Sequence, residues 1–353
     1  MTSTEGVTAA FADFVASADA AAIPEHVKHA ARRTIANSVC LSAAAAYHPA
    51  VQIALAVAQS AGVGGPARII GRPERTSTAW AATLNAMSAH VEDFDDTHLR
   101  TVTHPGAPIV PAALAMAERT GAGDDDVLTA VILGAEVALR VGNGICPGHF
   151  DRCWHVTGTV GHLGAAVAAA RLLGLDRERL GTAIAIAIAI AATEAAGVQD
   201  ALGTMTKCLN PGKAAGDGVR AAQLAQFGLA GPPDPIEGRH GLGEVMAPIA
   251  DYAEMTRGIG TRWEIVDRRP AKQVQRLSLF RGGLPVRWRG TGAVHRRDCP
   301  LAGCGRPAPP GARRARRLLC QGRMLRRRYY PVRRTARTPR RACDRQRGQP
   351  DDR

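Results

Sequence analysis

The 353-residue sequence is poor in several residue types, and each shortage argues against a class of protein. It has four lysines, and aromatic residues make up 4% of the chain. Its eight cysteines include no C-x-x-C pair, so neither the spacing of a zinc site nor a disulfide framework is visible. No uncharged apolar run reaches the roughly 18 residues of a membrane-spanning helix. We therefore expect neither a zinc module, nor a disulfide-stapled domain, nor a membrane protein.

The beginning of the chain lacks the features of a secretory signal. Its first 20 residues, MTSTEGVTAAFADFVASADA, carry acidic residues where a signal peptide has its basic region. The most apolar stretch, GTAIAIAIAIAATEAAG (181–197), is mostly alanine and is interrupted by Glu194. We therefore expect a cytoplasmic protein that has no membrane partner.

The net charge of +14 is concentrated at one end of the chain. Residues 274–353 hold 23 arginines and four aspartates but no lysine and no glutamate, whereas residues 1–273 hold 22 basic and 27 acidic residues. The tail has no sustained periodicity and cannot bury enough apolar surface to offset its ordering entropy, so it is predicted to be disordered. Two interpretations remain open: an arm that binds nucleic acid non-specifically, or a GC-rich gene translated out of frame.

The body of the sequence has the periodicity of helices. Apolar residues recur at intervals of three and four over 77–94, 108–121 and 124–145. Segment 159–197 is predicted to form two helices joined at GLDRE, and Pro24 is placed at a helix start.

One stretch of the body imitates a strand, because alanine and isoleucine alternate over 183–190. Its alanine content and helical neighbourhood favour a largely buried helix. The fold class is therefore predicted to be mainly α, with an all-helical domain over 1–268. Residues 269–353 are predicted to be an aberrant Arg- and Pro-rich segment.

Protonatable side chains gather in VEDFDDTHLRTVTHPGAP, residues 91–108. If the preceding helix continues into it, Asp93, Asp96 and Thr97 share one face and Asp95 points elsewhere. Three interpretations compete: a solvated acidic helix end, a Mg²⁺ site, and an acid–base site in which carboxylates tune histidines.

The residues that follow the acidic run favour the acid–base interpretation. His104 is followed by Pro105 and Gly106, which are expected to halt the helix and hold the imidazole on a fixed loop. A magnesium-dependent helical enzyme that handles diphosphates would need a second acidic cluster, and the sequence has none.

Two further segments carry polar groups at helix starts. In CWHVTGTVGHLG (153–164), His155 and two threonines precede a helix whose free N–H groups can bind an anion, although simple capping by a threonine is the alternative. In GTMTKCLNPGKAAGDG (203–218), Lys207 and Lys213 flank an N-P-G turn, and small residues permit close approach of a ligand or a helix.

Together the three segments resemble the best-known blocks of the MmgE/PrpD family, which contains 2-methylcitrate dehydratases and cis-aconitate decarboxylases. The resemblance runs from about residue 7 to 265, in the family's order and spacing. It implies a large helical domain, a smaller α+β domain, a site between them and a homodimer. It also implies a lyase that acts on small di- or tricarboxylates by acid–base catalysis, without a metal or any other cofactor.

The resemblance also assigns site residues by their position in the motifs. Asp93 and Thr97 of the D-x-D-D-T block, His104 of HPG, His155 of the WH block and Lys207 of G-x-M-x-K would line the site. Residue chemistry agrees, because Lys207 and His155 can bind carboxylates and a histidine such as His104 can move a proton near neutral pH. A carboxylate epimerase or isomerase, which would use the same groups, stays an alternative, as does the nucleic-acid-binding protein.

The sequence departs from the family after WEIVDRRPAKQ (263–273), where the resemblance predicts a block like Y-K-x-Y-P-C-G. Codons permitted for VQRLSLFRGGLP (274–285) can be chosen so that a one-base shift reads Y-N-A-Y-P-C-S-G-V-V-F-P. We therefore expect that out-of-frame translation replaces the smaller domain, through a pseudogene-like allele or a sequencing error. The chain as written is then expected to be inactive or poorly folded.

Overall fold

The computed structural model describes residues 6–62, 64–174 and 177–266, and the side chains of 177–180 are not among them. The helices are α1 (Val7–Ser17), α2 (Glu25–Ala44), α3 (Pro49–Ser60), α4 (Thr78–His90), α5 (Gly106–Thr120), α6 (Asp124–Ile145), α7 (Gly148–Asp151), α8 (Val156–Arg171), α9 (Arg177–Glu194), α10 (Leu209–Gln226), α11 (Leu242–Met246) and α12 (Tyr252–Thr256). Three 3₁₀ turns, η1 (Gln199–Ala201), η2 (Met205–Cys208) and η3 (Glu264–Val266), and a small antiparallel pair, β1 (Ala67–Arg68) and β2 (Arg75–Thr76), complete the described part.

The mainly α fold class is confirmed. The helix over 124–145 has the predicted bounds, and Pro24 directly precedes α2. The stretch with alternating alanine and isoleucine is helical, and among its buried residues Ala183, Ile184, Ala187 and Ile188 follow the helical spacing, with Ala189 buried beside them. The prediction for 269–353 falls outside the described residues.

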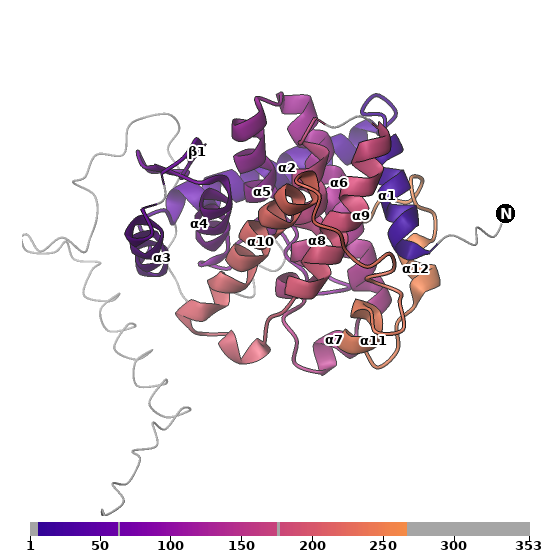
Figure 1. The fold of residues 1–353 in the computed structure, drawn as a ribbon. Coiled ribbons are helices and arrows are strands. Elements are labelled where there is room, and N and C mark those ends of the chain that lie inside the picture. Colours follow the sequence, from indigo (N-terminus) through magenta and orange to yellow (C-terminus); the bar gives the residue numbers. More distant parts are fainter. Residues whose placement is uncertain (1–5, 63, 175–176, 267–353) are drawn as a thin grey trace, which may run out of the picture. The chain divides into compact units, whose positions relative to one another are not determined.

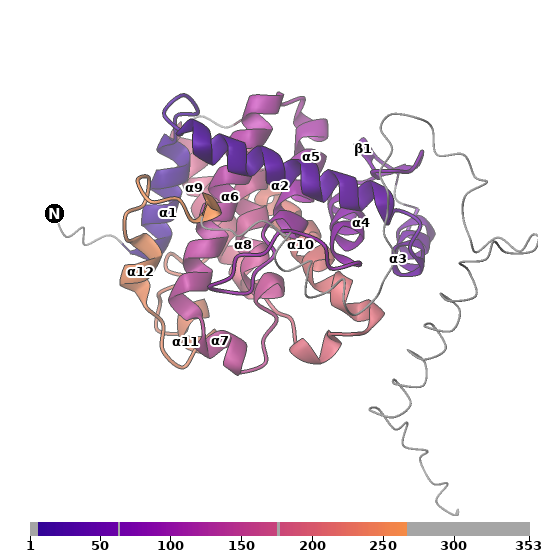
Figure 2. The ribbon, with the colours of Figure 1, turned by 180° about the vertical axis from the view of Figure 1, so that it is seen from behind.

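Helix α8 is the centre of the described bundle, with α5, α6, α9 and α10 packed against it (Figure 1). Every residue from Val156 to Ala170 is buried. From the opposite side, Figure 2 shows α2 lying across this core, where it contacts α4, α5 and α6.

Small residues set the close spacing of these helices. At the crossing of α6 and α8, a Cβ built on Gly164 would lie 2.8 Å from the carbonyl oxygen of Gly134, closer than real Cβ contacts come. At the crossing of α4 and α10, a Cβ on Gly212 would lie 2.5 Å from a side-chain carbon of Met87. The expectation that glycines near Lys213 permit close helix approach is confirmed.

The buried side chain of Arg140, on α6, forms hydrogen bonds with the last described segment, residues 255–265. The guanidinium of Arg140 donates to Oε2 of Glu136 at 3.2 Å and to four backbone carbonyls, those of Met255, Arg257, Gly258 and Arg262. Glu136 in turn accepts from the backbone N–H of Ile265 at 2.9 Å. One fully buried ion pair therefore connects α6 with residues 255–265.

By length and composition, α6 is the one described helix that could cross a membrane by itself. All of its apolar window is buried inside the protein, which is typical of the core helix of a soluble protein. Helices α2 and α3 would pass the same test only as one span, and they are bent by 83°.

Candidate active site

A small cleft collects four of the five predicted site residues. Its volume is about 180 Å³. Asp93 and His104 come from the α4–α5 loop, His155 from the start of α8 and Lys207 from η2. The other lining residues are Val102, Phe150, Trp154, Val156, Gln199 and Leu202. The fifth, Thr97, is buried beside the cleft, with Oγ1 3.4 Å from Nδ1 of His104.

The sequence predicts that α4 continues into the acidic segment, but the structure shows that it does not. Helix α4 ends at His90, and Asp93 has a left-handed backbone with a φ of 61°. The prediction that Asp95 points elsewhere is therefore wrong, because helical spacing does not apply beyond His90. Asp95 instead turns into the site, and Asp96 accepts from the backbone N–H of Gly106 at 3.0 Å.

The HPG motif also has a different role from the predicted one. Pro105 and Gly106 do not halt a helix; they begin α5, with Pro105 at its N-cap. The backbone N–H of His104 donates to Oγ1 of Thr157 at 3.0 Å, which ties this loop to α8. His104 is therefore held on a fixed segment, as expected, but ahead of a helix.

His155, and not a threonine, caps α8. Its Nδ1 accepts from the backbone N–H of Gly158 at 3.1 Å. Thr157 and Thr159 lie inside the helix, where Thr159 contacts Nε2 of His149 at 2.9 Å. The start of α8 is thus near the cleft, as predicted, but its cap is an imidazole.

Asp95 and His90 are the two residues of the site that the sequence did not assign to it, although Asp95 belongs to the D-x-D-D-T block. Oδ2 of Asp95 lies 2.8 Å from Nδ1 of His90, and Oδ1 lies 3.4 Å from Nδ1 of His104. The rings of His90 and His104 meet edge to face, with centroids 4.9 Å apart. A signal was present, since Asp95 belongs to the acidic run that follows His90, but only the end of α4 at His90 brings the two together.

A second acidic group lies on the cleft side of His104. Oδ1 of Asp93 is 4.0 Å from Nε2 of His104 and 2.5 Å from Nζ of Lys207. Asp93 therefore lies between the imidazole and the ammonium group, and its side chain is 57% exposed. Lys207 and His104 are each 15% exposed.

The electrostatic environment separates the three histidines. Burial opposes a charge on His104, but the carboxylates of Asp95 and Asp93 outweigh burial and raise its pKa. Burial lowers the pKa of His90 despite Asp95, and it lowers the pKa of His155 to about 3. Burial also acts against an ionised Asp95, but His104 and His90 outweigh it and hold the pKa of Asp95 well below its usual range.

Four side chains of the site could also hold a metal ion. One ligand atom each of His90, Asp93, Asp95 and His104 lies within 4.8 Å of the others. Their charges, however, already have partners within the chain, because Lys207 pairs with Asp93 and the two imidazoles flank Asp95. The donor set therefore suits a self-balanced acid–base site as well as it suits a cation.

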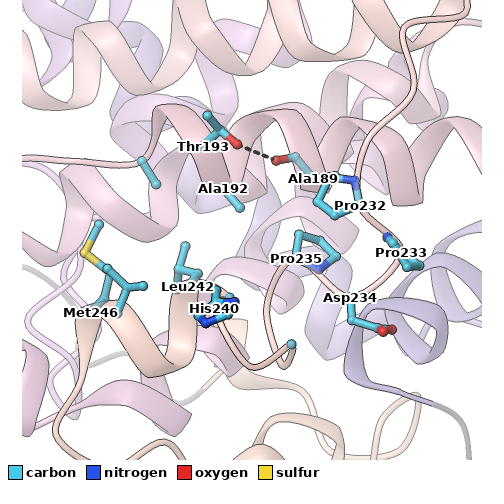
Figure 3. A pocket seen from close by; sticks show the side chains of 14 residues that line it. Ala189, Ala192, Thr193, Pro232, Pro233, Asp234, Pro235, His240, Leu242 and Met246 are labelled. Atoms are coloured by element: carbon cyan, nitrogen blue, oxygen red, sulfur yellow. Dashed lines mark hydrogen bonds between the residues drawn. The ribbon is translucent and has the colours of Figure 1, made fainter.

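A larger hollow of about 480 Å³ lies elsewhere, between α9 and residues 232–246. Figure 3 shows three prolines, Pro232, Pro233 and Pro235, facing Ala192 and Thr193 of α9. Its titratable lining residues are Asp234 and His240, and none of the predicted site residues borders it. The smaller cleft is therefore the better candidate for chemistry.

Known proteins match half of the chain or more. A stretch of 197 residues is 32% identical to human cis-aconitate decarboxylase and covers 52% of this chain and 40% of the human protein. A stretch of 273 residues is 26% identical to cis-aconitate decarboxylase of Aspergillus terreus (strain NIH 2624 / FGSC A1156) and covers 73% of this chain and 55% of that protein. The chain thus spans about half the length of the curated relatives it matches, or less.

The three site segments lie within one family match. Residues 9–255 match the MmgE/PrpD N-terminal domain, which is well over half of the chain. This range includes the α4–α5 loop, the start of α8 and η2, and so every residue of the cleft. The chain belongs to the MmgE/PrpD family.

Proposed function

We propose that this chain has the active-site half of a lyase that acts on a small di- or tricarboxylate. The leading reaction is decarboxylation of the cis-aconitate type, and dehydration of the 2-methylcitrate type is the related one. One observation carries the proposal: a buried Asp95 faces His104, and Lys207 lies on the other side of that imidazole in a small cleft.

His104 is the proton donor in this proposal. Its Nδ1 faces Asp95 and its Nε2 is on the side of Asp93, which lines the cleft. In a decarboxylation, the bond between the carbon skeleton and one carboxylate breaks, its electron pair stays on the skeleton, and CO₂ leaves. Nε2 of His104 then gives its proton to the skeleton carbon on which the electron pair ends, and the proton on Nδ1 stays beside Asp95. The raised pKa of His104 supplies the acid form that this step needs.

Lys207 and His155 bind the substrate's remaining carboxylates. Nδ1 of His155 accepts a hydrogen bond from Gly158, so the neutral ring carries its proton on Nε2 and acts as an uncharged donor. Lys207 contributes a charge-assisted hydrogen bond. The N-terminal ends of α5 and α8 adjoin His104 and His155, and their partial positive charge favours an anion there.

The rest of the cleft suits a short hydrocarbon skeleton. Val102, Phe150 and Leu202 form apolar parts of its wall. A cleft of about 180 Å³ admits a small molecule and excludes a nucleotide or a peptide. Polar groups on one side and apolar groups on the other match an unsaturated polycarboxylate.

The proposed chemistry uses no metal. Lys207 and the charged form of His104 balance the charge of a carboxylate substrate, and His155 adds an uncharged hydrogen-bond donor. His104 also carries out the proton transfer. Because the cluster of His90, Asp93, Asp95 and His104 could hold a cation, a chelator belongs in the assay.

The test is turnover of cis-aconitate and of 2-methylcitrate in the presence of EDTA, followed as release of CO₂ or loss of water. It compares the 353-residue chain with a version whose reading frame is restored near codon 274. We expect turnover by the frame-restored protein and a loss of about a hundredfold or more in His104→Gln. If neither protein acts on any polycarboxylate, or if EDTA abolishes turnover, the proposal is wrong.

A further inference from the structure

Asp95 lies between two imidazoles, and the proposed chemistry uses only one of them. His104 lines the cleft, whereas His90, the last residue of α4, is completely buried and does not line it. The closer of the two contacts is the one to His90, at 2.8 Å against 3.4 Å. His90 therefore holds Asp95 more tightly than the residue that faces the substrate does.

The two imidazoles cannot both be positively charged. Two imidazolium ions against one carboxylate would leave a net positive charge in the interior, which is strongly unfavourable. Burial lowers the pKa of His90, while Asp95 and Asp93 raise the pKa of His104. His90 is therefore neutral and has one ring proton. Since Nδ1 faces the ionised Asp95, that proton is on Nδ1.

This arrangement leaves Nε2 of His90 as a buried acceptor. Within residues 6–62, 64–174 and 177–266 it has no hydrogen-bond partner. A buried acceptor without a partner destabilises a fold, and an apolar side chain of similar size would avoid that cost. A buried polar group that lacks a hydrogen-bond partner is typical of positions that are kept for function.

We propose that His90 is a positioning residue. It donates its Nδ1–H to Oδ2 of Asp95 and so fixes the carboxylate with Oδ1 toward Nδ1 of His104. The titration of His104 then depends on the orientation of Asp95 as well as on its charge. The other titratable groups around His104 are Asp93, Lys207, His155 and His90, whose ring contacts that of His104 directly and which also shares Asp95 with it. Only the effect on turnover rests on the proposed function.

The first test needs no substrate. ¹⁵N NMR of the 353-residue chain labelled at histidine distinguishes the two neutral tautomers of each ring. We expect His90 to stay neutral across the pH range in which His104 titrates, with its proton on Nδ1. A proton on Nε2 of His90, or a His90 that charges together with His104, would overturn the proposal.

Two variants separate positioning from packing. His90→Asn retains an N–H donor near the place of Nδ1, whereas His90→Phe retains a ring without a donor. We expect the pKa of His104 to stay close to the wild-type value in the Asn variant and to fall in the Phe variant. A purely structural role would lower the unfolding temperature of both variants without moving this titration. If His104 titrates unchanged or at a higher pH in the Phe variant, Asp95 needs no second donor and the proposal fails. If the Phe variant does not fold, the tautomer of wild-type His90 and the titration in the Asn variant decide.

Turnover gives an independent readout. On a polycarboxylate that the wild type consumes, His90→Phe should lower kcat by about tenfold to a hundredfold, the range found for residues that orient metal-binding side chains, and leave KM unchanged. An unchanged kcat would count against the role of His90. If neither the 353-residue chain nor the frame-restored version consumes a polycarboxylate, the proposed function fails, while the NMR titration still decides what His90 does.

Discussion

Lys207 is the one residue with a permanent positive charge among those that line the cleft. Its Nζ lies 2.5 Å from Oδ1 of Asp93, so in the free protein the ammonium group already has an anionic partner. A carboxylate substrate would share or replace that partner. Binding strength at this position is therefore a difference between two ion pairs.

Lys207→Met should raise KM for the polycarboxylate about tenfold to a hundredfold, with a smaller effect on kcat. The methionine keeps the length of the side chain but removes one charge-assisted hydrogen bond, which is worth about 1.5–3 kcal/mol. Steady-state kinetics measure the split between KM and kcat. Lys213→Met is the matched control, because Lys213 lies on α10, away from the cleft lining, and donates to the carbonyl of Glu194. Equal KM values in the two variants would contradict this role for Lys207.

Asp95→Asn should move the alkaline limb of the pH profile to lower pH. Decarboxylation needs the acid form of His104, so kcat/KM falls as the pH rises through the pKa of that residue. In the wild type Asp95 and Asp93 raise this pKa above 6.5; without the Asp95 charge, burial and Lys207 act against the charged imidazole with only Asp93 to offset them, so the pKa falls. The profile of kcat/KM against pH measures the shift.

The same variant has a stability signature. A raised pKa for His104 contributes stability that is fully present below its unfolded-state value of 6.5 and is lost as the pH rises through the folded-state value. Asp95→Asn should remove this part of the pH dependence of unfolding. If the profile of kcat/KM against pH moved toward higher pH in Asp95→Asn, Asp95 would not be the group that holds the proton on His104.

Sequence motifs identify most of the site residues, but they do not predict the position of every one. Asp93, His104, His155 and Lys207 could be named from the sequence, because each stands at a recognisable block, and the structure brings them into one cleft. Asp95 could not be placed, because its direction depends on α4 ending at His90 and on the left-handed backbone at Asp93. Such a backbone is locally unfavourable and is maintained by tertiary contacts that no periodicity encodes.

At the level of the helices, periodicity was a reliable guide and termini were not. Helix α6 has the predicted bounds because Asp124–Asp126 supply a strongly acidic first turn after Gly123. Helix α4 is shorter than predicted, and α5 begins where a helix was expected to stop. Both misplaced ends adjoin the site, where hydrogen bonds across the chain, such as Asp96 to Gly106, set the termini.

The crossing of α6 and α8 provides an element-scale prediction. Gly164→Ala should lower the free energy of unfolding by about 1–3 kcal/mol, because the added methyl group would meet the carbonyl of Gly134 and overpack the crossing. Urea denaturation measures the change.

Gly181→Ala is the matched control for that substitution. Gly181 lies in α9, and the nearest atom to its added Cβ, in Ala16, is 3.8 Å away. Replacing a helical glycine at such an open position should stabilise the protein by up to about 1 kcal/mol. If both substitutions stabilised it, the close packing of α6 and α8 would not depend on glycine.

For the whole chain, the decisive question is the reading frame beyond residue 273. The 353-residue chain should bind duplex DNA of any sequence at low salt and release it steeply as salt rises, because 23 arginines stand in its last 80 residues. The frame-restored version should lose this binding and act on a polycarboxylate. Gel retardation at several salt concentrations tests the binding, a turnover assay tests the activity, and resequencing across codons 265–290 decides which reading frame is native. A confirmed frame and an active 353-residue protein would show that the Arg-rich segment is native.

The glycine and alanine packing around α8 has a consequence for motion in the site. Alanine and glycine have no side-chain rotamers to lose when they are buried, so these residues add little to the side-chain entropy cost of forming the core around α8. Without rotamers, there are also few alternative ways to pack the helix, and its backbone is held directly against its neighbours. Catalytic groups must keep their positions to within about half an ångström. His155 and Thr157 lie at the start of this helix, which is packed too closely to shift by repacking. The site can therefore adapt to different substrates only through the loops opposite these residues.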